Sequence, residues 1–503
     1  MTARPEDDST PPLLPYGFAR EAGILVRGRD RLADIVATID AAPHAFIEVR
    51  RVLGMPLRIE TATRPAFERL LSEQYAMRPV DAADIGDERE GDDLSRLADG
   101  LAATEDLLAA DDDAPVIRLI NGLIAEAARR DASDLHIEPR EKGYHVRMRV
   151  DGVLEDRLTL PAHIGPALLS RIKVMARLDI TERRLPQDGR ISLAIGGKAL
   201  DIRVSTLPAR HGERAVLRLL DHEREHLTIP ALGMKPATEA AFLDALESPS
   251  GIILVSGPTG SGKTTTLYAG LGQLNDRSRN ILTIEDPVEY ALEGIGQTQV
   301  NAKVGMSFAA GLRAILRQDP DIVMVGEIRD AETARIAIQA SLTGHLVLST
   351  IHTNSAVAAV TRLRDMGMEP FLLSSSLKAV LAQRLLRRLC RSCRVAETPD
   401  AATEALFAEY GVAVAQLNRP GDGCPDCKGS GHAGRIAVHE ILRIDARARR
   451  LIHDAADEAD LAAHAMPKVD GLFAHGLGRA AAGEVALAEV MRVCRQEESD
   501  GGL

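Results

Sequence analysis

Residues 257–265 read GPTGSGKTT and directly follow the apolar run of residues 251–255. In the GxxxxGK[ST] pattern, glycines let the backbone turn tightly so that successive N–H groups point at phosphate oxygens, and the following helix offers its positive end. Lys263 is expected to reach the β- and γ-phosphates of ATP, and Thr264 to bind Mg²⁺. A chance match in a turn is the alternative, but an apolar strand before the motif and a helix after it favour a nucleotide site. The predicted nucleotide-binding residues are Gly257, Pro258, Thr259, Gly260, Ser261, Gly262, Lys263, Thr264 and Thr265.

Four short apolar runs surround this loop in the sequence. They cover residues 252–256, 281–284, 322–325 and 346–350, and each is followed by polar residues and then a helical pattern. Such alternation predicts an α/β domain with a doubly wound parallel sheet. Because functional groups in such sheets gather at the carboxyl ends of the strands, we expect the catalytic residues there.

Acidic residues and histidines stand next to these strands. Glu327 is predicted to hold Mg²⁺ through water or to position the attacking water, and Glu285 either to support the site from a second layer or to orient water. Either glutamate could instead cap a helix or pair with Arg329, and the sequence does not decide which one accepts the proton. His345 and His352 bracket the strand expected beside the loop, so we expect them to sense the γ-phosphate, although a lone histidine is more often structural.

Four of the five cysteines form two CxxC pairs, Cys390 with Cys393 and Cys424 with Cys427, separated by 30 residues. Each pair brings two thiolates onto one ion, so the two pairs predict a closed tetrahedral Zn²⁺ site without an open position. Such a site is structural rather than catalytic. Unligated thiols and an iron–sulfur cluster are the weaker alternatives, and Cys494 matches no motif.

Composition divides the part of the chain before the loop. Residues 1–80 mix short apolar runs, turns and a helical pattern over 32–39, which predicts a small α+β domain. Residues 81–113 hold thirteen acidic residues against two arginines, which predicts a flexible linker. Residues 114–221 begin with an amphipathic helical pattern and continue with alternating strands around a hairpin turn, which predicts a second α+β domain.

Two prolines mark a connector over residues 222–236, and residues 237–503 form the predicted P-loop domain with a cysteine module at 385–440. Five arginines cluster around the first CxxC pair. They are Arg384, Arg387, Arg388, Arg391 and Arg394. Such a run is usually a solvated face, and the alternative is a surface that touches anionic lipid or an acidic partner.

Charge and hydropathy exclude some classes of protein. The 73 acidic residues against 61 basic ones give a net charge of −12, which argues against a protein that coats nucleic acid. No run approaches the ~20 apolar residues that a membrane-spanning helix needs. The first residues, MTARPEDDSTPP, lack the apolar core of a secretory signal. We therefore expect a cytoplasmic protein.

Four segments resemble, in order and spacing, the Walker A, Asp box, Walker B and His box of secretion ATPases, the motors of type II secretion and type IV pili. They are GPTGSGKTT (257–265), ILTIEDPVEY (281–290), DPDIVMVGEIRD (319–330) and GHLVLSTIHTN (344–354). Upstream, ASDLHIEP, RLPQDGRI and STLPARHGERAVLRLLD are similar to the same family, and LPYGFAREAGILV (14–26) resembles its type II secretion branch. The similarity covers about residues 12–445.

This resemblance implies a RecA-like P-loop domain preceded by a PAS-like α+β domain and a small N-terminal α+β domain, with a zinc-binding insertion. It also implies a homo-hexamer that holds nucleotide between the P-loop domain and the preceding domain. Arg203 and Arg218 of that preceding domain would reach the γ-phosphate. Arg203 faces away from the apolar side of its strand and Arg218 interrupts an apolar run, where a charge is costly unless it is paired. A structural salt bridge is the alternative.

The implied function is an ATP-hydrolysing motor that powers protein export across the outer membrane by driving pseudopilus assembly in type II secretion. Residues 1–80 would bind the cytoplasmic domain of an inner-membrane platform protein, which makes the motor peripheral on that membrane. A type IV pilus extension ATPase is the nearest alternative. A nucleotide-gated scaffold is less favoured because both strand-end glutamates are present, and so is a DNA translocase, because the sequence shows no nucleic-acid module. We expect no nucleic-acid partner.

Overall fold

The computed structural model describes residues 114–195, 198–221, 228–465 and 470–494. Within the first 113 residues it describes mainly 22–29, 33–38 and 41–64, and residues 14, 19, 67, 70 and 467 are described singly. The chain divides into two compact units, Met1–Arg224 and Glu225–Leu503, and the division falls within the predicted connector. The predicted linker over 81–113 lies outside the described residues.

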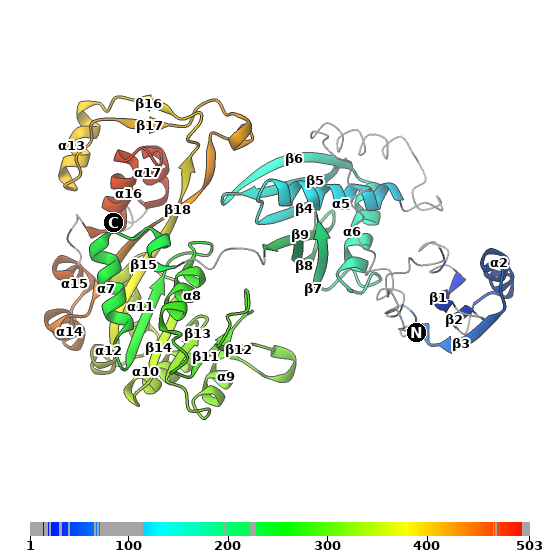
Figure 1. Ribbon diagram of the computed structural model, residues 1–503, viewed down its shortest axis with the longest axis horizontal. Helices are drawn as coiled ribbons and strands as arrows, with labels where there is room; N and C mark the ends of the chain where they lie inside the picture. The colour runs from blue at the N-terminus through cyan, green and yellow to red at the C-terminus, as the bar shows by residue number, and fades with distance from the viewer. Residues whose placement is uncertain are drawn as a thin grey trace, which may run out of the picture. The chain divides into compact units, whose positions relative to one another are not determined.

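The second unit is built on a seven-stranded sheet of order β12-β11-β13-β14-β10-β15-β18 (Figure 1). Its strands are β10 Gly251–Ser256, β11 Ile281–Glu285, β12 Gly296–Gln299, β13 Ile322–Val325, β14 Leu346–Ile351, β15 Leu377–Leu389 and β18 His432–Arg443. The four predicted strands are confirmed as β10, β11, β13 and β14. Neighbours run parallel except β15 and β18, which pair antiparallel, so the sheet is mixed at one edge rather than parallel throughout.

Helices cover both faces of this sheet, because its central strands bury side chains alternately on each side. On β10, Ile253 and Val255 pack into one apolar cluster, and Ile252 and Leu254 pack into another. The first face carries η1 Ile229–Leu232, α7 Pro236–Leu246 and α8 Lys263–Leu274, and the second carries α9 Phe308–Ile315, α10 Ala331–Leu342, α11 Ala356–Asp365 and α12 Pro370–Ser376. This is the layered arrangement of a doubly wound α/β domain.

After β15 the chain builds the cysteine module and the C-terminal helices. These elements are β16 Val395–Glu397, α13 Ala401–Glu409, β17 Leu417–Arg419, η3 Pro425–Cys427, α14 Ala446–His453, α15 Glu458–Ala465, α16 Leu472–Ala481 and α17 Leu487–Cys494; a short η2 at Ala302–Val304 lies earlier in the chain. Leu477 of α16 and Val490 of α17 belong to the same apolar cluster as α10 and α11. The C-terminal helices therefore extend the core of the P-loop domain.

The first unit contains a six-stranded antiparallel sheet of order β6-β5-β4-β9-β8-β7. Its elements are α5 Ala114–Arg129, β4 Asp134–Arg140, β5 Gly143–Val150, β6 Val153–Pro161, α6 Ile164–Met175, β7 Gln187–Ile195, β8 Lys198–Ala209 and β9 Gly212–Asp221. The alternating pattern of β5 buries Tyr144, Val146 and Met148 in a cluster with α5 and α6. The predicted helix at the start of this segment and the predicted hairpin are confirmed.

Near the N-terminus, three strands and a helix form a smaller element, with β1 Ile24–Arg29, β2 Ala33–Thr38, α2 Pro43–Leu53 and β3 Leu57–Ala62. The predicted helical pattern over 32–39 is wrong, because the structure has β2 there. Short apolar runs satisfy the spacing of a helix and of a buried strand alike. The segment forms a strand because β2 pairs with both β1 and β3, and five of its six residues are buried.

In the part of the chain that the structure describes, no helix has both the length and the apolar character needed to cross a membrane.

Candidate functional site

The GPTGSGKTT loop connects β10 to α8 at the carboxyl edge of the sheet. Gly257 has a φ of +147°, and a Cβ there would lie 2.5 Å from the carbonyl oxygen of Gln383. Gly262 has a φ of +85°, and a Cβ there would lie 2.8 Å from the Nε2 of the same glutamine. Both positions require glycine, for the backbone and for the space. The loop therefore passes close to β15 and delivers the amino end of α8 to the edge of the sheet.

Lys263 is the first residue of α8, and its ammonium folds back onto the loop. The Nζ donates to the carbonyl oxygens of Gly257 at 2.8 Å and Pro258 at 3.0 Å, and the residue is 8% exposed. Burial lowers the pKa of Lys263 to about 8; the Glu327 carboxylate opposes this shift and the Arg384 charge adds to it. The ammonium is thus placed to exchange two backbone carbonyls for phosphate oxygens.

Ser261 gives independent support for a ligand in the loop. Its Oγ is buried and has no hydrogen-bond partner among the described residues. An unpaired buried hydroxyl costs free energy, and a phosphate oxygen in the loop would supply the missing acceptor. The residues present therefore fit MgATP, with Lys263 for the phosphates and Thr264, in the first turn of α8, for the metal.

Gln383 on β15 holds the loop in place, and sequence reasoning missed it. Its Nε2 donates to the carbonyl oxygen of Ser261 at 2.6 Å, and its Oε1 accepts from Thr266 Oγ1 at 2.6 Å. The residue is 2% exposed and lies 122 residues after Ser261 in the sequence. The one sequence signal was a polar residue inside the apolar run that became β15.

Arg384 lies beside the nucleotide loop and not on a solvated face, so that expectation is wrong for this arginine. It is 6% exposed, and its guanidinium donates to the carbonyl oxygens of Asn354 at 2.5 Å and Gln383 at 3.1 Å. Its positive charge also acts on Lys263, where it helps to lower the pKa of the lysine.

Glu327 follows β13 and contacts basic groups on both sides. Its carboxylate forms an ion pair with Arg329, the partner considered as the alternative, and lies 3.6 Å from His352 Nε2. Burial, followed by the charge of Lys263, lowers the pKa of His352. The structure thus brings Lys263, Glu327 and His352 together at the carboxyl ends of neighbouring strands.

Glu285 ends β11 and is buried in a hydrogen-bond network. It accepts from the Tyr268 hydroxyl, from Thr283 Oγ1 at 2.6 Å and from Gln297 Nε2 at 3.1 Å. Burial, followed by the bond to Glu285, raises the pKa of Tyr268, which lies on α8. Glu285 therefore connects β11 to the helix that carries Lys263.

His345 lies at the wrong end of its strand for the role expected from the sequence. It precedes β14, where its Nδ1 lies 2.9 Å from the carbonyl oxygen of Ala340 and its own carbonyl accepts from Gly251 N at 3.1 Å. A strand of six residues spans about 20 Å. His345 is thus at the amino edge of the sheet and Lys263 is at the carboxyl edge. The expectation that His345 senses the γ-phosphate is wrong, and for His352 this role stays a prediction.

Arg203 and Arg218 are cross-strand neighbours on β8 and β9 of the first unit. The Nε of Arg218 donates to Asp134 Oδ1 at 2.8 Å. The pKa of Asp134 is lowered: burial raises it, but the hydrogen bond from Arg218 is among the contacts that outweigh burial. The side chain of Arg218 nevertheless remains 57% exposed. A salt bridge therefore exists, and it leaves much of this guanidinium accessible.

The four predicted cysteines converge. Their Sγ atoms all lie within 4.8 Å of one another, with 3.6 Å between Cys390 and Cys424 and 3.7 Å between Cys393 and Cys427. Four thiolates at about 2.3 Å from one zinc ion stand about 3.8 Å apart in a tetrahedron. Backbone N–H groups of Cys424 and Gly431 donate to Cys427 Sγ, each at 3.2 Å, which favours a thiolate. The arrangement fits a tetrahedral metal ion.

The nucleotide loop follows the central strand β10, and the carboxylate of Glu327 follows β13 at the same edge of the sheet. These two features define the chain as a P-loop ATPase. Residues 109–492 match the model of the family described as Type II/IV secretion system protein, and residues 13–75 match the model of an N-terminal domain of GSPII protein E. The chain belongs to the type II/IV secretion system protein family, and the resemblance seen in its motifs is confirmed.

Known relatives cover nearly all of the chain. It is 52% identical over 490 residues to Type II secretion system protein E of Klebsiella pneumoniae, covering 96% of this chain and 97% of the relative. It is 48% identical over 502 residues to Type II secretion system ATPase E of Vibrio cholerae, covering 99% of each. Among solved structures, the pilus retraction motor PilT with bound ADP is 27% identical, with a TM-score of 0.50 over 73% of this chain and 95% of that one. The Legionella pneumophila ATPase DotB, at 20% identity, has a TM-score of 0.55 over 74% of this chain and 94% of DotB, which shows similarity of fold.

Proposed function

We propose that this ATPase hydrolyses MgATP to power protein export across the outer membrane by driving pseudopilus assembly in type II secretion. The observation that carries the proposal is the convergence of Lys263, Glu327 and His352 at the carboxyl edge of the sheet. Support for the secretion role comes from relatives named type II secretion system protein E over almost the whole chain. A pilus-extension motor stays the alternative, because the chain is also similar, at a lower identity of 27%, to PilT, a pilus motor that drives retraction.

In the proposed mechanism, the nine loop residues hold the phosphates and Lys263 exchanges its carbonyl partners for them. Bound Mg²⁺ supplies charge stabilisation to the transferring phosphoryl group. Glu327 orients the attacking water or holds the metal through water, and His352 contacts the γ-phosphate. Glu285 acts from a second layer, since it connects β11 to the P-loop helix through Tyr268.

Arg203 and Arg218 are proposed to supply positive charge to the γ-phosphate from the preceding domain. The exposed fraction of Arg218 and the pairing of the two arginines across adjacent strands support this role. Residues 114–221 form an antiparallel sheet with two helices, and we retain a PAS-like domain as the interpretation of that fold.

The four cysteines are proposed to bind one structural Zn²⁺. All four available ligands would be protein thiolates, which leaves no position for substrate or water. The spacing of the Sγ atoms supports this assignment.

The assembly is proposed to be a homo-hexamer, cytoplasmic and peripheral on the inner membrane. The match of residues 13–75 to the N-terminal domain of GSPII protein E supports a role of residues 1–80 in binding the cytoplasmic domain of an inner-membrane platform protein. A contact between anionic lipid and the arginines of the cluster other than the buried Arg384 would add to this attachment, and no nucleic-acid partner is proposed.

The test of the enzymatic proposal is phosphate release by Lys263→Ala and Glu327→Gln, with Lys378→Ala as the control. Lys378 lies on β15, is partly buried and packs against Gly251 at the opposite edge of the sheet from the loop. Lys263→Ala should abolish turnover, and Glu327→Gln should bind ATP without hydrolysing it. Wild-type turnover in Lys263→Ala would refute the proposed site, and normal hydrolysis by Glu327→Gln would transfer the primary role to Glu285.

A separate test addresses the partner. A chain lacking residues 1–80 should keep basal hydrolysis and fail to bind the cytoplasmic part of the platform protein in a pull-down. Retention of binding by the shortened chain would contradict the assignment of the N-terminal domain.

A further inference from the structure

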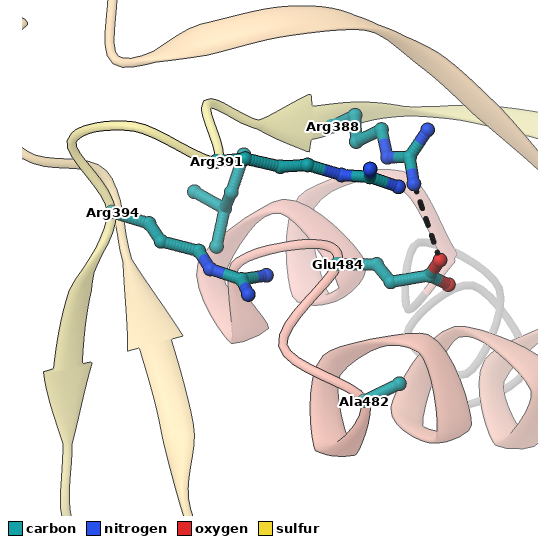
Figure 2. Close-up of a pocket in the computed structure, with 6 residues that line it drawn as sticks. Arg388, Arg391, Arg394, Ala482 and Glu484 are labelled. Atoms are coloured by element: carbon teal, nitrogen blue, oxygen red, sulfur yellow. Dashed lines mark ion pairs between the residues drawn. The ribbon is translucent and has the colours of Figure 1, made fainter.

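Three arginines surround a hollow between the cysteine module and the C-terminal helices. The hollow has a volume of about 300 Å³ and is lined by Arg388, Leu389, Arg391, Arg394, Ala482 and Glu484. Figure 2 shows the arginines on the segment that runs from the end of β15 through the first CxxC pair, facing the turn between α16 and α17 that carries Ala482 and Glu484. A volume of this size suits a small ligand rather than a single water molecule.

Positive charge is in excess around the hollow. The lining offers three guanidinium groups and one carboxylate, that of Glu484. This carboxylate lies 3.5 Å from Arg388 and is also shared with Arg479 at 2.8 Å, which lies outside the lining. Such local excess stands out in a chain of net charge −12. Like charges gathered in one hollow repel each other unless an anion lies between them.

The walls of the hollow are held together by hydrogen bonds to neutral carbonyl oxygens, which do not neutralise the positive charge of the arginines. Arg394 Nη1 donates to the carbonyl oxygen of Gly483 at 2.5 Å, and the backbone N–H of Leu389 donates to the carbonyl oxygen of Glu484 at 2.8 Å. The first contact pairs a cation with a neutral acceptor, so it leaves the charge uncompensated. Arg391 is exposed and forms no hydrogen bond or ion pair with any residue that the structure describes.

The cysteine module orients two of these arginines. Arg391 lies between Cys390 and Cys393, and Arg394 follows Cys393 directly. The Sγ atoms of these two cysteines belong to the converged cluster, so the backbone that carries both arginines is fixed at the cluster. Such preorganisation reduces the ordering cost of binding a ligand.

We propose that this hollow, the three-arginine pocket, binds a phosphate group carried by a small molecule or by a lipid headgroup. Guanidinium groups recognise phosphate oxygens through paired, charge-assisted hydrogen bonds, and Arg391 supplies donors that no described residue occupies. The pocket is separate from the nucleotide loop, since Arg384, at the loop end of β15, belongs to the other site. The proposal does not depend on ATP hydrolysis.

The experiment measures binding of radiolabelled pyrophosphate by equilibrium dialysis. It uses the full-length, zinc-loaded chain carrying Lys263→Ala, which weakens phosphate binding at the nucleotide loop. We compare this background with the same background plus Arg391→Gln, and with a matched control, Arg449→Gln, an exposed arginine of α14 away from the pocket. Arg391→Gln should weaken binding about tenfold, as expected for the loss of charge-assisted hydrogen bonds, and Arg449→Gln should leave it unchanged.

A sedimentation assay with lipid vesicles distinguishes a lipid headgroup from a soluble phosphate compound as the ligand. A lipid headgroup is assigned if the chain sediments with vesicles of phosphatidylglycerol and phosphatidylcholine but not with phosphatidylcholine alone. This sedimentation must also depend on Arg391 and be competed by pyrophosphate. Arg391-dependent pyrophosphate binding without such sedimentation assigns it to a soluble ligand. Absence of pyrophosphate binding, or binding equal in the Arg391→Gln and Arg449→Gln chains, overturns the proposal. ATP turnover of Arg391→Gln in an otherwise wild-type chain is measured in parallel and should be unchanged, so failure of the pocket is distinguishable from failure of the ATPase site.

Discussion

Nucleotide binding should take up a proton at Lys263. In the free site, burial lowers the pKa of this lysine from 10.5 to about 8, so the neutral amine becomes populated as the pH rises through 8. Phosphate oxygens close to Nζ favour the ammonium and raise this pKa. With a pKa of about 8, the neutral fraction is about 0.1 at pH 7 and about 0.8 at pH 8.5. Binding of MgADP should therefore take up about 0.1 proton at pH 7 and about 0.8 proton at pH 8.5.

Isothermal titration calorimetry in buffers of different ionisation enthalpy measures this number directly. The slope of the observed binding enthalpy against the buffer ionisation enthalpy gives the protons taken up. The slope should be near zero at pH 7 and rise steeply by pH 8.5. ADP phosphates and His352, whose pKa is lowered, are already deprotonated at pH 8.5 and should contribute little.

Glu327→Gln serves as a control, because it should shift the pKa of Lys263 in a known direction. The carboxylate of Glu327 raises the pKa of Lys263, so its neutralisation should lower that pKa further and move the onset of proton uptake to lower pH. Equal slopes at pH 7 and 8.5 in the wild-type chain would refute the argument, because they would show that the ammonium does not lose its proton in the free site.

Other perturbations separate the remaining assignments. Cys393→Ser should reduce bound zinc below one ion per chain by elemental analysis and expose residues 385–440 to limited proteolysis, because structural zinc contributes folding free energy; full zinc content would contradict the metal site. Arg203→Ala and Arg218→Ala should each lower turnover at least about 100-fold with nearly unchanged melting temperatures; a loss of several degrees with preserved turnover would make these arginines structural. Gln383→Ala removes both hydrogen bonds to the loop region and should destabilise the second unit by about 2 kcal/mol or more in urea unfolding, and an unchanged midpoint would show that the loop does not depend on them.

The elements that could be predicted from the sequence are those specified by neighbouring residues. Strands buried on both faces appear as continuous apolar runs, so β10, β11, β13 and β14 were identified almost to the residue. The loop at 257–265 was found because its motif is contiguous. Each CxxC pair was recognised because its two cysteines are close in the sequence, and the convergence of the two pairs was inferred from the number of ligands that a zinc ion needs.

What could not be predicted depends on contacts between distant segments. Gln383 and Arg384 become part of the nucleotide site because β15 pairs with β10, and no local sequence pattern predicts that pairing. His345 and His352 are equivalent in sequence as residues bracketing a strand, yet the direction of β14 puts them at opposite edges of the sheet. The spacing of the apolar residues at 32–39 fits a helix and a strand alike, and only the pairing with two other strands makes this segment a strand.

Strand β15 joins two sites within one continuous piece of backbone. It has 13 residues, holds the nucleotide loop through Gln383, and passes directly into Cys390. Since side chains alternate from face to face along a strand, deleting a single residue between these two positions would turn the cysteine to the opposite face and draw it back by about 3.3 Å. We expect that the proposed metal ligation by Cys390 and the support of the loop by Gln383 would not both survive such a change. The length of this strand is therefore as strictly constrained as the identity of the residues in either motif, and an insertion or deletion here should be far more damaging than a substitution at most of its positions.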